Sequence, residues 1–228
     1  MAQPKLLDLF ARAQGSSVGY ARAGFRVTAN DMDHYDRHPE VENFIQADAF
    51  ALLADVRFCR QFDAITASPN CEGYSDLAYL PTTAHRDQEI PRVRAALEKI
   101  GRPYVIENVD SKSTRAEMIK PLRVCGSMFN LGSPCRDGEW RQLRRHRLFE
   151  RGLWPEDALY GPLSCRHGKL TGGVYGTGGG GPQTRGYRFW PEEAKLAMGI
   201  TWMHRNDICK AIPPRYTQMI GRWLIESV

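Results

Sequence analysis

Short apolar runs and helix-like spacing alternate along the first half of the chain. An apolar run over residues 6–10 is typical of a buried strand, and the small residues after it predict a turn and a helix over residues 18–23. Gly24 is placed to cap that helix, and residues 26–29 predict the next strand. Further strands are predicted over residues 43–46, 62–67 and 104–106. This alternation predicts an α/β fold with an open, mostly parallel sheet.

Two other stretches carry apolar residues at helical spacing. In residues 87–100 these are Ile90, Val93, Leu97 and Ile100. In residues 214–227 they are Tyr216, Ile220, Trp223 and Leu224. The first stretch predicts a helix that crosses between the last two strands, and the second predicts a helix packed against the core.

Reactive or polar side chains follow the ends of the predicted strands. They are Asp31, Asp48, Cys71, and the pair Glu107 and Asn108. Because the carboxyl ends of parallel strands meet at one edge of a sheet, we expect these side chains to lie close together. Cys71 is a candidate nucleophile, and a buried, inert thiol is the other interpretation. Asp31 is placed to accept the hydroxyls of a ribose, although the turn before it lacks a dinucleotide-binding fingerprint.

Composition allows one substantial core and changes the functional picture little. The chain has 228 residues, 42% of them hydrophobic, and a net charge of +5 that is compatible with a nucleic-acid partner. No apolar run approaches the roughly 18 residues that span a bilayer, and the N-terminus lacks the apolar core of a signal peptide. We expect a cytoplasmic protein in a bacterial or phage-infected cell, with no membrane partner. Six scattered cysteines show no disulfide framework.

Arginines gather between residues 136 and 151. They are Arg136, Arg141, Arg144, Arg145, Arg147 and Arg151, with Trp140 and Phe149 among them. Positive and aromatic side chains in one stretch are suited to phosphate contacts. A solvated charged surface is the other interpretation.

Five motifs, taken in order, resemble those of the DNA cytosine-5 methyltransferases, and the compact phage-like members most. They are Asp8-Leu9-Phe10 with Gly15 and Ala23-Gly24-Phe25, then Ser68-Pro69-Asn70-Cys71, Glu107-Asn108-Val109, Arg145-His146-Arg147 and Ala211-Ile212-Pro213-Pro214. The match spans nearly the whole chain. The resemblance implies a Rossmann-like fold dependent on S-adenosylmethionine, with a mostly parallel sheet flanked by helices and a small recognition subdomain.

The resemblance also implies a catalytic set. The Cys71 thiolate would add to C6 of a cytosine while Glu107 shares a proton with N3, so that C5 becomes nucleophilic. The base would be flipped out of double-stranded DNA to reach these groups. Arg145 and Arg147 would orient the base and the cysteine loop, and Asn108 would brace that loop.

A pocket for S-adenosyl-L-methionine is implied as well. Phe10 and Pro69 would lie on the two sides of the adenine, Asp31 would bind the ribose and Asp48 the adenine amino group. For the two acids, helix capping or turn formation is the other interpretation. The full set of implied cofactor-binding residues is Asp8, Phe10, Ala11, Arg12, Ala13, Gln14, Gly15, Asp31, Met32, Asp48, Ala49, Pro69, Lys210 and Ala211.

The chain departs from the family pattern around the cofactor. Arg12 and Gln14 stand where the family has glycine, Glu72 follows the cysteine, and Lys210 precedes the last motif. Two added cations indicate an anion to be balanced, because a buried charge needs a partner. That anion is the carboxylate of carboxy-S-adenosyl-L-methionine if the protein is a carboxymethyltransferase. Otherwise the two cations contact the cofactor's own carboxylate, a DNA phosphate or solvent.

The motifs divide the chain into three parts. Residues 1–147 are expected to form the catalytic, cofactor-binding domain, residues 148–208 a small DNA-recognition subdomain, and residues 209–228 a return to the catalytic domain. The glycine-rich residues 172–181 are either a loop that orders on DNA or a surface linker. We expect a monomer, and a catalytically inactive DNA-binding homologue or an RNA substrate stays open.

A zinc site is considered and not expected. Cys125, Cys135, Cys165 and His167 are ligand types that zinc favours. They lack the paired Cys-x-x-Cys spacing that is typical of zinc sites, so the sequence predicts no metal.

Overall fold

A seven-stranded sheet forms the centre of the molecule. The computed structural model describes residues 2–71, 74, 88–154, 164–175 and 186–228. The strands of this main sheet are β1 (Lys5–Leu9), β2 (Arg26–Asp31), β3 (Asn43–Gln46), β4 (Ala64–Ala67), β5 (Tyr104–Val109), β6 (Leu122–Val124) and β9 (Arg147–Gly152). Their order is β3-β2-β1-β4-β5-β9-β6, and β9 alone among them runs antiparallel to its neighbours. The predicted mostly parallel sheet is therefore confirmed.

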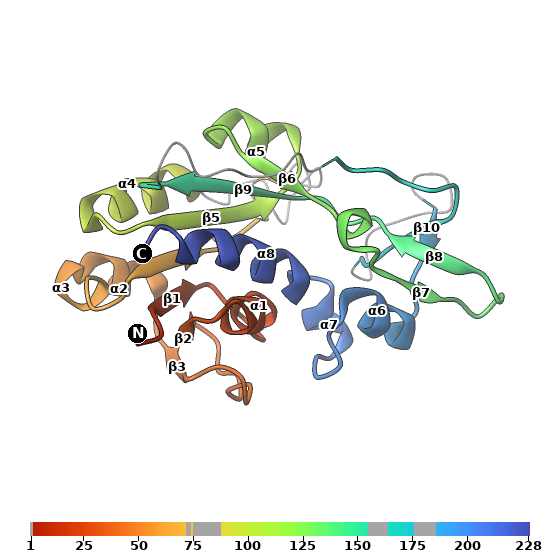
Figure 1. The fold of residues 1–228 in the computed structure, drawn as a ribbon, viewed down its shortest axis with the longest axis horizontal. Coiled ribbons are helices and arrows are strands. Elements are labelled where there is room, and N and C mark those ends of the chain that lie inside the picture. The colour runs from red at the N-terminus through yellow and green to blue at the C-terminus, as the bar shows by residue number, and fades with distance from the viewer. Residues whose placement is uncertain (1, 72–73, 75–87, 155–163, 176–185) are drawn as a thin grey trace.

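Helices cover both faces of the main sheet (Figure 1). On one face lie α1 (Gly15–Ala23) and α8 (Pro214–Ile225), which pack against each other. On the other lie α2 (Ala49–Ala54), α3 (Val56–Cys59) and α4 (Ile90–Ile100). The remaining connections include α5 (Lys112–Glu117) and the short 3-10 helix η1 (Gly126–Phe129). No helix within the described ranges is both long and apolar enough to cross a membrane.

The two-residue period of the strands divides their apolar side chains between the two helical layers. In β1, Leu6 packs with α1 and α8, whereas Leu7 and Leu9 pack with α2 and α4. In β5, Val105 and Ile106 divide in the same way. The strands are thus buried on both faces, which explains why they read as continuous apolar runs in the sequence.

Most predicted elements are confirmed, with shifted ends. Gly24 caps α1 in the left-handed region at φ 116° and donates to the carbonyls of Tyr20 and Ala21, as expected for a helix C-cap. The strand predicted over residues 62–67 begins at Ala64, and the one predicted over 104–106 continues to Val109. The longer strand matters because Glu107 and Asn108 lie inside it.

A second, four-stranded sheet lies beyond the carboxyl edge of the main sheet, on the right in Figure 1. It consists of β7 (Gly132–Pro134), β8 (Trp140–Leu143), β10 (Thr171–Gly173) and β11 (Tyr187–Arg188), in the order β11-β10-β8-β7. The helix α6 (Pro191–Met198) packs against this sheet, and α7 (Arg205–Ile208) packs beside α6. Of the glycine-rich residues 172–181, those from 176 onward lie outside the described residues.

The predicted domain boundary at residues 147 and 148 does not separate the two sheets. β7 and β8 come before it, and β9, which begins at it, belongs to the main sheet. The physical reason is that Leu148 and Phe149 are buried on opposite faces of the main sheet, where β9 pairs with β5. The small sheet is therefore assembled from segments on both sides of a main-sheet strand.

A glycine permits the close approach of α1 and α8. A Cβ atom on Gly19 would overlap the Pro214 carbonyl oxygen and the Thr217 hydroxyl. We expect Gly19→Ala to lower the free energy of unfolding by about 1–3 kcal/mol through overpacking, as measured by urea denaturation. Arg22→Ala on the exposed side of α1 removes only a surface ion pair with Glu40 and should cost under about 1 kcal/mol. Equal losses in the two variants would contradict this account.

Candidate active site

A cavity of about 540 Å³ opens at the carboxyl edge of the main sheet, where the predicted side chains were expected to meet. Its wall includes the turn after β1, the ends of β2, β4 and β5, and the segment before α8. Of the implied catalytic residues, Cys71, Glu107 and Arg147 line it. The implied cofactor residues that line it are Phe10, Ala11, Arg12, Ala13, Gly15, Asp31, Met32, Asp48, Ala49, Pro69, Lys210 and Ala211.

The turn after β1 has an unusual backbone. Phe10, Arg12 and Gln14 all adopt positive φ angles, of 60°, 47° and 66°. A left-handed backbone costs a non-glycine residue roughly 1–2 kcal/mol, so the turn is held in shape by its contacts. Gln14 supplies some of them, because its Nε2 donates to the Asp36 carbonyl and its Oε1 accepts from the His38 N–H. Gln14 is therefore buried beside residues 36–38 and does not line the cavity.

Arg12 brings a positive charge into the cavity wall. Its backbone N–H donates to Asp31 Oδ2 at 2.8 Å, and its Nη2 lies 4.0 Å from Asp207 Oδ1. Its Nε is buried and makes no hydrogen bond within the described part of the chain. Lys210 lines the same cavity, as does Asp207, which the sequence analysis did not single out. The wall therefore carries Arg12 and Lys210 beside Asp207, and it also includes the carboxyl groups of Asp31, Asp33, Asp48, Glu89 and Glu107.

Asp8 lies beneath the cavity and serves the fold. Its carboxylate accepts hydrogen bonds from the hydroxyls of Ser16, Ser17 and Thr66, at 2.6–2.7 Å. Burial raises the pKa of Asp8, although the three hydroxyls oppose this rise. The residue joins β1 to α1 and β4, and it does not line the cavity that it was expected to serve.

Asp31 and Asp48 reach the cavity while also ordering the backbone. Asp31 accepts from the N–H groups of Arg12 and Asp33, and Asp48 caps α2 by accepting from the Phe50 N–H at 2.9 Å. The capping interpretation of Asp48 is thus confirmed, and it is compatible with a place in the cavity wall. A carboxylate fixed in this way presents its remaining acceptor sites in a defined direction.

The cysteine loop is braced from the neighbouring strand. Asn108 Nδ2 donates to the Pro69 carbonyl at 3.1 Å, the kind of contact expected for Asn108. The Asn70 N–H donates to Glu89 at the start of α4. Cys71 is half-buried and lines the cavity, so its sulfur is not sealed in the core. Glu72 and Gly73 lie outside the described residues.

Glu107 is buried beside a cation. Arg147 Nε lies 2.9 Å from Glu107 Oε1. Burial raises the pKa of Glu107, and this effect outweighs the opposing influence of Arg147, Ser68 and Arg145. Glu107 therefore retains its proton to higher pH than an exposed glutamate, which suits a group that donates a proton.

Arg145 has a different place from Arg147. Its buried guanidinium donates to the carbonyls of Val174, Cys209 and Ala211, at 2.7–3.1 Å. Burial, with Arg147 nearby, lowers the pKa of Arg145 to about 9, so it stays charged at neutral pH. Arg145 does not line the cavity. It fixes the backbone on both sides of Lys210.

The clustered arginines do not share one surface. Arg145 is buried and Phe149 is fully buried in the main sheet, so neither is available to a phosphate. Arg136 stacks on Trp190 and Arg141 on Tyr187, with the guanidinium carbon 3.9 and 4.2 Å from the ring centroid. These contacts hold the first two arginines of the cluster against aromatic rings of the second sheet and its helix.

Comparisons with known proteins identify the fold. No family model matches the chain, and no curated protein matches it in sequence. A protein described as a DNA modification methyltransferase encoded within an E. coli prophage is 16% identical, with a TM-score of 0.54 over 98% of this chain and 99% of that one. The Entamoeba histolytica methyltransferase EhMeth is 11% identical (TM-score 0.60; 99% of each chain), and a triple mutant of Spodoptera frugiperda DNMT2 is 13% identical (0.59; 97% and 99%). The chain has the Rossmann-like fold of these methyltransferases.

The raised pKa of Glu107 generates a pH-dependent prediction. When the pKa of a buried acid is higher in the folded protein than in the unfolded chain, the folded protein becomes less stable as pH rises through the interval between these two pKa values. Glu107→Gln mimics the protonated form, so its melting temperature relative to wild type should increase between pH 5 and pH 8, measured by thermal unfolding. The exposed Glu98→Gln should show no such trend. A difference independent of pH would contradict the assignment.

Proposed function

We propose that the protein is a DNA cytosine-5 methyltransferase acting on double-stranded DNA with S-adenosyl-L-methionine as donor. The observation that carries the proposal is that Cys71 and Glu107 line one cavity together with Asp31 and Asp48. A thiol, an acid that retains its proton, and two fixed carboxylates are the groups that this reaction needs. Two structural neighbours, one described as a DNA modification methyltransferase and the other as DNMT2, support the same assignment.

The residues of the cavity fit the donor. A volume of about 540 Å³ lies within the range of small-molecule sites. Asp31 can accept hydrogen bonds from ribose hydroxyls and Asp48 from the adenine amino group, while Phe10, edge-on to Phe50, offers an apolar face to the base. When bound, the donor supplies an electrophilic methyl carbon on its sulfonium.

The chain's own groups carry the activation of cytosine. The Cys71 thiolate forms a bond to C6 while Glu107 shares its proton with N3, which leaves C5 electron-rich enough to take the methyl group. Loss of the C5 proton then breaks the bond to Cys71 and restores the aromatic ring. Arg147, 2.9 Å from Glu107, holds that carboxyl in place. Asn108 holds the loop that carries Cys71 through the Pro69 carbonyl.

Covalent trapping tests the proposal. Wild-type protein incubated with donor and duplex DNA containing 5-fluorocytosine should form an adduct that survives denaturing electrophoresis, because the fluorine cannot leave as the C5 proton does. Cys71→Ser should form no adduct and lower turnover by about 1,000-fold or more. Cys135→Ser, in the core of the second sheet, should behave as wild type. DNA binding without an adduct would identify an inactive homologue, and an adduct with RNA alone would identify an RNA enzyme; either overturns the proposal.

A second candidate function differs only in the group transferred. Arg12 and Lys210 line the cavity, and the buried Arg12 Nε makes no hydrogen bond within the described residues. A buried donor without an acceptor is costly and favours a ligand with an added carboxylate. That donor is carboxy-S-adenosyl-L-methionine, and the product is carboxymethylcytosine in DNA.

Donor competition separates the two candidates. With equal amounts of both donors, a carboxymethyltransferase should yield carboxymethylcytosine, measured by mass spectrometry of the nucleosides. Arg12→Gly and Lys210→Asn should then each shift the product ratio toward methylcytosine by about tenfold, the value of one charge-assisted hydrogen bond. Arg57→Ala on the exposed side of α3 should leave the ratio unchanged. Methylcytosine alone from wild type would reject carboxymethyl transfer.

A further inference from the structure

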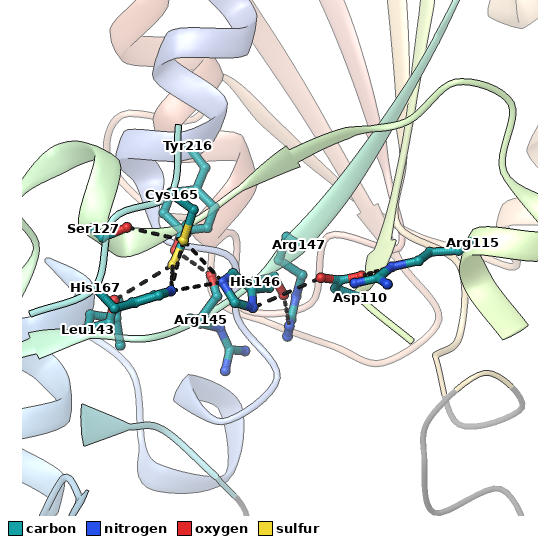
Figure 2. Close-up of polar contacts among 11 residues, drawn as sticks. Asp110, Arg115, Ser127, Leu143, Arg145, His146, Arg147, Cys165, His167 and Tyr216 are labelled. Carbon is teal, nitrogen blue, oxygen red and sulfur yellow. Dashed lines mark hydrogen bonds and ion pairs between the residues drawn. The ribbon is translucent and has the colours of Figure 1, made fainter. Parts of the chain in front are cut away.

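Four side chains outside the cavity lie close together, and Figure 2 labels three of them, His146, Cys165 and His167. They are Cys125, His146, Cys165 and His167, and their sulfur and ring nitrogen atoms all lie within 4.8 Å of one another. Cys165 Sγ is 2.8 Å from His167 Nε2 and 3.3 Å from His146 Nε2. The two Nε2 atoms are 3.1 Å apart, and Cys125 Sγ is 3.9 Å from that of His167.

We propose that these four residues bind a structural zinc ion. In a tetrahedral zinc site with ordinary bond lengths, neighbouring ligand atoms are about 3.3–3.8 Å apart, and the distances observed here scatter around that range. Two thiolates and two imidazoles form a ligand set that zinc favours and that magnesium and calcium do not. Because four protein ligands leave no open coordination position, the ion would hold structure and would not activate a substrate.

The surroundings suit ligands that carry charge. The Ser127 hydroxyl lies 3.4 Å from the Cys165 sulfur, where it can donate a hydrogen bond to a thiolate. On the far side of the His146 ring, Asp110 Oδ2 lies 3.9 Å from Nδ1, and Arg115 holds this carboxylate (Figure 2). A carboxylate behind a ligating histidine orients the ring and makes it a stronger ligand.

The position of the site indicates what the ion would stabilise. Cys125 follows β6, His146 lies between β8 and β9, and Cys165 and His167 lie in the segment before β10. The ion would therefore cross-link the main sheet to the chain that enters the second sheet. His146 also stands between Arg145 and Arg147, so its coordination would fix the loop that places both arginines. A cross-link that closes such long loops removes conformational freedom from the unfolded chain.

Three of these ligands are among the zinc-type residues noted in the sequence, where Cys135 stood in place of His146. The structure places Cys135 in the core of the second sheet, where its sulfur donates to the Ser133 carbonyl. His146 was overlooked because it lies inside an arginine motif. Ligands spread over 43 positions, with a single Cys-x-His pair, have no spacing signature that a sequence alone would show.

Metal analysis of untagged protein tests the inference, and it does not depend on methyl transfer. Protein purified from zinc-supplemented medium, with a reductant and without chelator, should contain about one zinc per chain by plasma mass spectrometry. The double variant Cys165→Ala/His167→Ala should fall below about 0.1 zinc per chain. Cys135→Ala and the exposed His34→Ala should retain the metal, as should His167→Cys, which replaces one zinc ligand by another.

Cobalt provides a second readout, which also detects a site emptied of metal during purification. Cobalt added to the metal-free, reduced protein should give thiolate charge-transfer absorption and the strong visible bands of tetrahedral coordination, and the double variant should give neither. Wild-type protein with no zinc and no cobalt spectrum would overturn the inference. A Cys125–Cys165 disulfide in protein purified without reductant, together with no uptake after reduction, would overturn it as well.

Discussion

The buried guanidinium of Arg145 is the interaction on which the arrangement of the two sheets depends. A cation in a protein interior must find acceptors for its N–H groups, and Arg145 finds them in the carbonyls of Val174, Cys209 and Ala211. Its own carbonyl accepts the Tyr216 hydroxyl of α8 at 2.7 Å. One residue thus joins β10, the segment before α8 and the strand that returns to the main sheet. The far wall of the cavity is positioned by this contact.

The cavity combines fixed acids with the cations Arg12, Arg147 and Lys210. Asp31 and Asp48 are oriented by backbone N–H groups, so they meet a ligand as preformed acceptors. Arg12 and Lys210 lie along the same wall, with Asp207 at the limit of ion-pair distance from Arg12. Acids outnumber cations along the whole lining, so the overall charge of the cavity does not by itself select an anionic ligand group. The identity of the transferred group therefore depends on the local contacts of Arg12 and Lys210, and the rest of the site is compatible with either donor.

The sequence correctly predicted which side chains meet at the cavity where those side chains lie at the carboxyl end of a strand. Cys71, Glu107, Asp31 and Asp48 all follow or end predicted strands, and all four line the cavity. The sequence did not predict the direction of side chains that are oriented by hydrogen bonds to residues far away in the chain. Gln14 turns toward residues 36–38 and Arg145 toward carbonyls some 30 and 65 positions away, and no local pattern records such contacts.

For a related reason, the sequence predicted a small subdomain over residues 148–208 but no second sheet. Its strands are two to four residues long, too short to show a period, and one main-sheet strand interrupts them in the chain. The convergence of His146 with Cys125, Cys165 and His167 arises from this same crossing of segments. The three side chains of the Arg-His-Arg motif therefore point in different directions. Arg147 faces the cavity, Arg145 faces the interior, and His146 faces the two cysteines.

The left-handed turn after β1 couples the cavity to a segment without regular structure. Its shape is maintained by Gln14 against residues 36–38, and by the Trp202 indole, which donates to the Ala13 carbonyl and packs on His38. If these contacts loosened, the backbone would relax toward commoner φ angles and the cavity floor would change with it. Ligand binding and order in residues 32–40 should therefore be a single equilibrium, in which part of the ligand's affinity is used to select the ordered form.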